Sequence, residues 1–161
     1  MILMKKINIP MLLAFLVLPL LAGIFGAYFT TQSIPTWYAG LEKPWFTPPN
    51  WAFGPVWTTL YLLMGIAAYI VADSEIDQKQ KKGALGVFGF QLALNGLWSF
   101  FFFGLRSPLL GLIGIIFLWL SIVWTIWLFA RVSKTAAWML VPYILWVSIA
   151  TALNLSIFLL N

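Results

Sequence analysis

The chain has 161 residues, of which 63% are hydrophobic and 8% charged. A soluble domain is about 45–50% apolar and about 25% charged, so this composition excludes an ordinary soluble protein and indicates an integral membrane protein. The sequence lacks cysteine and histidine, which excludes disulfides and removes the commonest metal ligand and general base. The net charge of +5 comes from a few basic residues in connectors. We interpret this charge as a signal that orients the protein in a membrane, so we expect no nucleic-acid partner. We also expect no metal site and no required cofactor.

Long apolar runs predict the architecture, because a membrane-crossing helix needs about 20 apolar residues. The sequence predicts one all-α domain, residues 1–161, in which a single bundle of five transmembrane helices carries a lid loop between the first two. The predicted spans are residues 9–30, 53–72, 83–104, 108–130 and 135–158. The first run is too long for the apolar part of a signal peptide, about 7–15 residues, so we predict that it is a retained span.

The connector after the first span has an unusual composition. Residues 37–57 contain four tryptophans and four prolines. Proline fixes the backbone angle φ, and tryptophan favours the boundary between membrane and water. The segment therefore predicts a rigid aromatic lid over a binding site at the membrane surface.

Aromatic and amide side chains recur at helical spacing on one face of the second, third and fifth spans. Unpaired polar groups are costly in hydrocarbon, so these faces predict an interior pocket for a flat, hydrophobic ligand. An alternative is that the amides simply join the helices to one another. The residues are Phe53, Trp57, Tyr61, Gln91, Asn95, Trp98, Tyr143, Trp146, Ala150 and Asn154. Pro142 is expected to kink the last helix.

Basic residues predict the orientation, because they accumulate on the inner side of a membrane. With five spans, seven of the nine basic residues fall on the side of the N-terminus and second and fourth connectors. Lys43 and Arg106 lie on the other side. We therefore expect the N-terminus inside and the C-terminus outside. Two pairs of small residues, Gly23 with Ala27 and Gly89 with Ala93, allow either close packing within the bundle or a homodimer contact.

Three blocks of the sequence form a specific pattern. The first is W-Y-x-x-L-x-K-P-x-x-x-P-P at residues 37–49, followed by Phe53, Pro55 and Trp57. The second is L-N-x-x-W-S at residues 94–99, and the third is P-Y-x-x-W at residues 142–146 with A-T-x-L-N after it. Together they resemble the translocator protein family, also called tryptophan-rich sensory proteins or peripheral-type benzodiazepine receptors (TspO/MBR). The resemblance covers nearly the whole chain.

The resemblance implies a five-helix bundle, usually homodimeric, that binds porphyrins such as protoporphyrin IX, haem and benzodiazepine-like ligands in a membrane. It implies a pocket at Trp57, Asn95, Trp98, Trp146 and Ala150. It also implies a lid, for which we expect Trp37, Tyr38, Pro44, Pro48 and Pro49 to be important. The cholesterol motif of animal members is broken here, since Leu159 replaces its basic residue, so cholesterol binding is poorly supported.

Three functions remain open on the sequence. The leading hypothesis is a protein of a bacterial cell membrane that senses, sequesters or transports tetrapyrroles. The second is light- and oxygen-dependent porphyrin degradation, for which the resemblance implicates Trp57 and Trp146. The third is a scaffold that contacts partner proteins through residues 73–82. No conventional catalytic arrangement is present in the sequence, so we expect no conventional enzyme.

Overall fold

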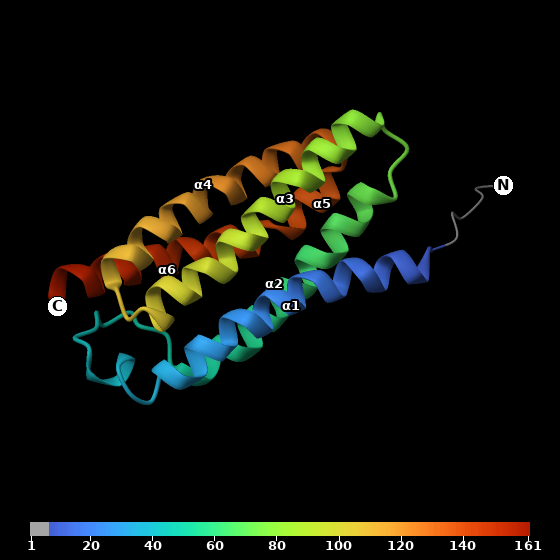
Figure 1. Cartoon of the computed structure of the whole chain (residues 1–161). Helices are drawn as coiled ribbons and strands as arrows, with labels where there is room; N and C mark the ends of the chain where they lie inside the picture. The colour runs from blue at the N-terminus through green and yellow to red at the C-terminus, as the bar shows by residue number, and fades with distance from the viewer. Residues whose placement is uncertain (1–6) are drawn as a thin grey trace.

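The computed structural model describes residues 7–161, and all of their regular structure is helical (Figure 1). Five helical segments are long and apolar enough to cross a membrane, which confirms the predicted fold class. The elements are α1 (Ile9–Ser33), the short turn η1 (Tyr38–Gly40), α2 (Asn50–Ala72), α3 (Gln78–Ser99), the π-helical turn η2 (Phe100–Gly104), α4 (Pro108–Val132), α5 (Lys134–Met139) and α6 (Val141–Leu160). Lys5 and Lys6, used in the orientation argument, lie outside the described residues.

Side-chain caps set where several helices begin. The Asn8 side chain accepts a hydrogen bond from the Met11 amide at the start of α1. Asp77 accepts from the amides of Lys79 and Gln80 at 3.0 and 3.3 Å. Such caps pair amides that the helix itself leaves free. The Asp77 cap explains why α3 begins at Gln78, five residues before the predicted span, within the stretch expected to be a connector.

The last span is interrupted near Pro142, as the sequence predicts. α5 ends at Met139, and α6 begins at Val141 after the turn residue Leu140. Proline cannot donate a backbone hydrogen bond, but it is tolerated in the first turn of a helix. Pro142 occupies that first turn of α6. The third span ends with a π-helical turn instead, in which the Leu105 amide donates to the Phe100 carbonyl at 2.8 Å.

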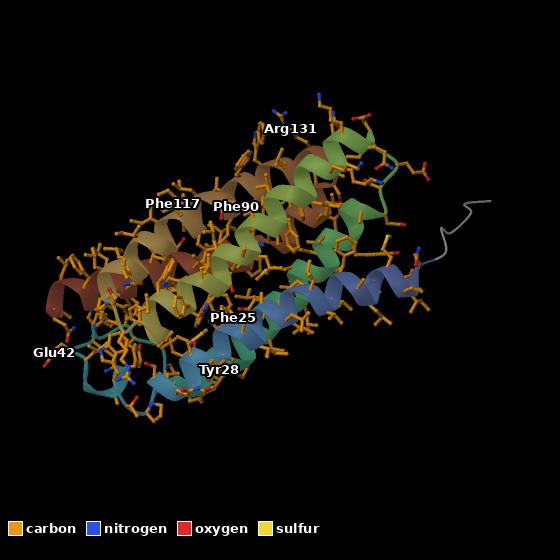
Figure 2. The ribbon with its side chains drawn as sticks, in the orientation of Figure 1. Phe25, Tyr28, Glu42, Phe90, Phe117 and Arg131 are labelled. Atoms are coloured by element: carbon orange, nitrogen blue, oxygen red, sulfur yellow. The ribbon has the colours of Figure 1, made fainter. Side chains whose placement is uncertain are left out.

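The helices pack as neighbouring pairs in one bundle. α1 lies along α2, α3 packs against α4, and α4 also packs against α6 (Figure 1). α1 is at the periphery, since only 11% of the residues in its most apolar stretch are buried. Side chains such as Tyr28 and Phe117 point outward, where they are 64% and 59% exposed (Figure 2). These outward faces suit contact with lipid.

Two glycines bring α1 and α2 close together. A Cβ atom on Gly23 would lie 2.4 Å from the ring of Tyr61, and one on Gly65 would lie 2.7 Å from the Phe15 carbonyl oxygen. Both distances are too short for any side chain. The Gly23 position therefore serves packing within the bundle. Gly89 differs, because a Cβ there would meet nothing within 4 Å.

Replacing Gly65 by leucine is expected to separate α1 from α2 and to destabilise the fold by about 1–3 kcal/mol, as overpacking does in other cores. The measurement is thermal unfolding in detergent, followed by circular dichroism. Gly83→Leu is the matched control, because a Cβ at Gly83 meets nothing within 4 Å. Equal unfolding temperatures for the two variants would contradict the close contact at Gly65.

Candidate functional site

Four aromatic rings from three helices meet in the interior of the bundle. The Trp57 ring stacks on Tyr61 with centroids 5.5 Å apart and planes 24° from parallel. The Trp57 centroid also lies 6.3 Å from that of Trp98 and 6.2 Å from that of Tyr143. These separations are typical of favourable aromatic pairs. Trp57, on α2, is therefore the centre of an aromatic cluster that includes rings from α3 and α6.

A chain of hydrogen bonds between buried side chains fixes the position of this cluster. The Tyr61 hydroxyl donates to Asn95 Oδ1 at 2.8 Å, and Asn95 Nδ2 donates to the Tyr143 hydroxyl at 3.1 Å. The Tyr143 hydroxyl in turn donates to Gln91 Oε1 at 2.9 Å. All four side chains are at most 8% exposed. The chain joins α2, α3 and α6, so the amides do connect helices, as the alternative interpretation of the sequence held.

A second buried link ties the third and last spans to the start of α4. Trp98 Nε1 donates to Asn154 Oδ1 at 3.2 Å, and Asn154 Nδ2 donates to the Pro108 carbonyl at 2.8 Å. A carbonyl oxygen has two lone pairs, so the Pro108 carbonyl at the start of α4 can accept this bond in addition to one within its helix. The link holds the Trp98 indole in a fixed orientation beside Trp57.

A pocket of about 350 Å³ lies between α1, α2 and α3, in front of the aromatic cluster. Its aromatic wall is formed by Phe53, Trp57, Tyr61, Trp98 and Phe103. The opposite wall comes from small residues of α1, namely Gly23, Gly26, Ala27, Thr30 and Thr31. Ile24 also lines the pocket and is 67% exposed, so one side of the pocket opens between α1 and α2 toward the surroundings of the bundle.

Three threonine hydroxyl groups along this pocket are already paired within their own helices. Thr30, Thr31 and Thr58 each donate to the carbonyl four residues earlier in their own helix, at 2.8–2.9 Å. The methyl groups of these threonines therefore add apolar surface to the pocket wall. The pocket therefore suits a hydrophobic ligand with a large flat face.

The predicted site residues fall into three groups. Phe53, Trp57, Tyr61 and Trp98 line the pocket. A second group is buried behind them in the hydrogen-bonded links, namely Gln91, Asn95, Tyr143 and Asn154. Trp146 lies on a shallow groove between α2 and α6, with its ring centroid 6.0 Å from that of Phe53. Ala150 is half-buried against the core.

Two buried donors at the edge of this region have no hydrogen-bond partner. They are Trp146 Nε1 and Gln91 Nε2. A buried polar atom without a partner is costly, so each is a position where a bound molecule with an acceptor would be stabilised. Trp146 is the more accessible of the two, because its ring also lines the groove between α2 and α6.

The lid is anchored by its first aromatic residues. Tyr38 is 2% exposed, and its ring packs between Phe102 and Phe103 with centroids 6.3 and 5.7 Å away. The Trp37 ring meets Phe102 at 5.4 Å. Burial raises the pKa of the Tyr38 hydroxyl to about 12, so it stays protonated at physiological pH. Lys43 Nζ donates to the Tyr38 and Leu41 carbonyls, both at 2.8 Å.

The lid prolines shape the return of the chain to α2. The Thr47 amide donates to the Pro44 carbonyl at 3.1 Å, which closes a turn. Pro49 then stands in an extended conformation immediately before the first residue of α2. The pocket lining stops at Ile34 and Asn50, the residues at which the chain leaves α1 and enters α2. The lid thus crosses the end of the bundle beside the pocket.

The α1 wall is the part of the site that the sequence argument missed. Its only signal is a set of small residues that share one helical face: Gly23, Gly26, Ala27, Thr30 and Thr31. The sequence left open whether the Gly23 pair serves packing within the bundle or a homodimer contact. Gly23 packs against Tyr61 within the bundle, and it also lines the pocket. Among residues 7–161, no three His, Cys, Asp or Glu side chains lie close enough to hold a metal ion.

Comparison with known proteins decides the family. Residues 15–160 match the TspO/MBR family. The chain belongs to the TspO/MBR family. The resemblance drawn from the tryptophan and proline blocks is therefore confirmed.

Relatives in this family match nearly the full chain. The tryptophan-rich protein TspO of Archaeoglobus fulgidus is 48% identical over 154 residues, covering 96% of this chain and 99% of the relative. The tryptophan-rich sensory protein of Cereibacter sphaeroides is 38% identical over 139 residues, covering 84% and 85%. The human translocator protein is 37% identical over 144 residues, covering 88% and 85%.

In this TspO/MBR-family protein, replacing Tyr143 by phenylalanine is expected to lower stability by about 1–2 kcal/mol. The change removes the hydroxyl that pairs with both Asn95 and Gln91, and it leaves Asn95 Nδ2 and Gln91 Oε1 without that partner. The measurement is urea or thermal unfolding in detergent. Tyr28→Phe is the control, since Tyr28 is 64% exposed. Unfolding that is equally unaffected in both variants would contradict a structural role for the hydrogen-bonded chain.

Proposed function

We propose that this protein binds a porphyrin-type tetrapyrrole in the aromatic pocket and acts as a tetrapyrrole sensor, sequestering protein or transporter. One observation carries the proposal: the stacked Trp57 and Tyr61 rings, with Trp98 beside them, form a wall of the pocket. A flat aromatic macrocycle gains both burial and ring stacking against such a wall. The names of two relatives, tryptophan-rich sensory protein and translocator protein, support the sensing and transport roles.

The size and openness of the pocket agree with a ligand that is only partly enclosed. A volume of about 350 Å³ is near the lower end of small-molecule sites, which span about 300–1,000 Å³. A macrocycle can place one edge against Trp57 while the rest extends through the opening between α1 and α2. The sequence has no histidine or cysteine to bind haem iron. This favours free-base porphyrins such as protoporphyrin IX over tightly ligated haem.

Charge at the two ends of the bundle supports an orientation with the C-terminus outside. Arg131 and Lys134 lie at the end where α3 begins, together with Lys79, Lys81 and Lys82. Lys43 and Arg106 lie at the lid end, and Figure 2 shows Arg131 and Glu42 at opposite ends. Excess basic charge favours the inner side of a cell membrane. We therefore propose a lid that faces outward, in a bacterial-type cell membrane.

A homodimer is part of the same proposal. Gly86 and Gly89 leave open space on the outer surface of α3, where a second helix could approach closely.

Benzodiazepine-like ligands, being flat and hydrophobic, suit the same pocket as the tetrapyrrole. Membrane lipid would cover the remaining apolar surface.

Replacing Trp57 by alanine is expected to weaken protoporphyrin IX binding by about 1–3 kcal/mol, because it removes the central stacking ring. The measurement is a titration in lipid nanodiscs, followed by the shift of the porphyrin absorption band. Trp124→Ala is the matched control, since Trp124 is 52% exposed on α4, away from the pocket. Equal affinity of both variants and the unaltered protein would contradict the pocket assignment.

A second variant tests the pocket without removing any ring. Gly54 lines the pocket, and a Cβ there would meet nothing within 4 Å. Gly54→Leu should therefore fold normally but fill the space that the ligand needs. We expect it to reduce porphyrin affinity at least tenfold, equal to about 1.4 kcal/mol. Unchanged affinity in a normally folded Gly54→Leu protein would place the ligand elsewhere.

The continuous contact between rings favours a second candidate function, which is light-dependent porphyrin degradation. Trp57 contacts Tyr61, Trp98 and Tyr143, and Phe53 joins the pocket to Trp146. Electron-rich rings beside an excited porphyrin could donate an electron, with molecular oxygen as the oxidant. The light and the porphyrin would supply most of this chemistry, and the protein would supply position.

Illumination separates the two functions. A binding protein returns protoporphyrin IX unchanged after illumination in air. A degrading protein converts it to a product with a new absorption spectrum, and Trp57→Phe and Trp146→Phe should abolish that product while retaining most of the affinity. Product formed equally well by both variants would contradict the role of these two tryptophans.

A further inference from the structure

The lid follows a path that reaches the far side of the bundle before it returns. The chain leaves α1 after Ser33, and Tyr38 packs against the end of the third span. It then approaches the end of α6, where Glu42 lies near the C-terminus, and returns to begin α2 at Asn50 (Figures 1 and 2). Glu42 is thus the point at which the loop meets the end of α6.

Asn161 holds Glu42 by two hydrogen bonds in opposite directions. The Glu42 amide donates to Asn161 Oδ1 at 3.1 Å, and Asn161 Nδ2 donates to the Glu42 carbonyl at 3.1 Å. The carboxamide therefore pairs with both polar groups of one residue, as a neighbouring strand would. Asn161 Nδ2 also donates to the Ile157 carbonyl at 2.9 Å, which fixes the side chain on the end of α6.

The two attachments of the lid differ in strength. Tyr38 is 2% exposed between two phenylalanine rings, so freeing it requires exposing buried aromatic surface. The hydrogen bonds between Glu42 and Asn161 are exposed, so water competes for both of them. Beyond Glu42 the side chains of the lid differ in exposure: Trp45 is 96% exposed, while Phe46 is half-buried against the core. The outer half is therefore the half that opens first.

We propose that Asn161 is a latch that holds the outer half of the lid, residues 42–49, closed over the end of the bundle. When the latch opens, Phe46 leaves the core while Tyr38 and the first turn of the lid stay in place. The hinge lies between Tyr38 and Glu42, and the long Lys43 side chain keeps its bonds to the Tyr38 and Leu41 carbonyls while the backbone beside it moves. For ligand exchange, the latch rests on the proposed function. The lid joins the pocket wall at Ile34 and Asn50, so its opening would add a second entrance beside the one between α1 and α2 and speed both capture and release.

Hydrogen–deuterium exchange of the ligand-free protein in nanodiscs tests the latch itself. Asn161→Ala should speed exchange of the Glu42 amide about tenfold, since each neutral hydrogen bond contributes a factor of about 2 to 10. Asn161→Asp should give an intermediate rate, because it keeps the acceptor for the Glu42 amide and loses the donor. Amides of residues 37–41 should exchange as in the unaltered protein.

Ser156→Ala is the matched control, because the Ser156 hydroxyl near the end of α6 donates only to the Ala152 carbonyl of its own helix. It should leave Glu42 exchange unchanged. Unchanged Glu42 exchange in Asn161→Ala would overturn the latch. Faster exchange that also appears in Ser156→Ala, or that spreads to Tyr38, would overturn it too, since it would indicate general loosening.

Stopped-flow exchange of protoporphyrin IX tests the consequence. In Asn161→Ala both the association and dissociation rates should rise several-fold, and Kd should change less than about twofold, because the latch affects access and not the pocket. Faster amide exchange with unchanged porphyrin rates would overturn the link to ligand access. A protein that takes up no porphyrin would refute the proposed function, while the amide exchange would still decide whether Asn161 holds the lid.

Discussion

Polar groups buried in a bilayer must find partners within the protein, and the chain from Tyr61 through Asn95 and Tyr143 to Gln91 provides them for these side chains, with the exception of Gln91 Nε2. It joins three helices at the depth of the aromatic cluster, so it fixes their rotation relative to one another. The stacked position of Trp57 follows, because its ring rests on Tyr61. The pocket is then the space that this fixed wall and the small residues of α1 leave between them.

The two ends of the site are stabilised differently. Deep in the bundle, hydrogen bonds and rings leave little freedom, and close contacts at Gly23 and Gly65 hold α1 against α2. At the lid, Tyr38 provides one firm attachment and Asn161 a weaker one. A rigid binding wall beside a partly releasable cover is the arrangement that a protein needs if it must hold a hydrophobic molecule and also exchange it.

Hydropathy and spacing predicted the spans, the interior faces and the break near Pro142, because each depends on the local sequence. The start of α3 was missed, since the Asp77 cap extends the helix into a charged stretch that resembles a connector. Which polar side chains pair, and whether Trp146 lines the pocket or the groove beside it, depends on how whole helices rotate and approach. The π-helical turn at Phe100 and the contribution of α1 likewise carry weak sequence signals.

Tryptophan fluorescence of the unaltered protein in nanodiscs tests the central claim most directly, namely that a tetrapyrrole lies against the Trp57 wall. The account predicts that protoporphyrin IX quenches this fluorescence in the dark along a saturable curve, and that a benzodiazepine-like ligand in excess restores it. Quenching that rises in proportion to added porphyrin, as it would for tryptophans that merely meet porphyrin dissolved in lipid, would contradict a defined site.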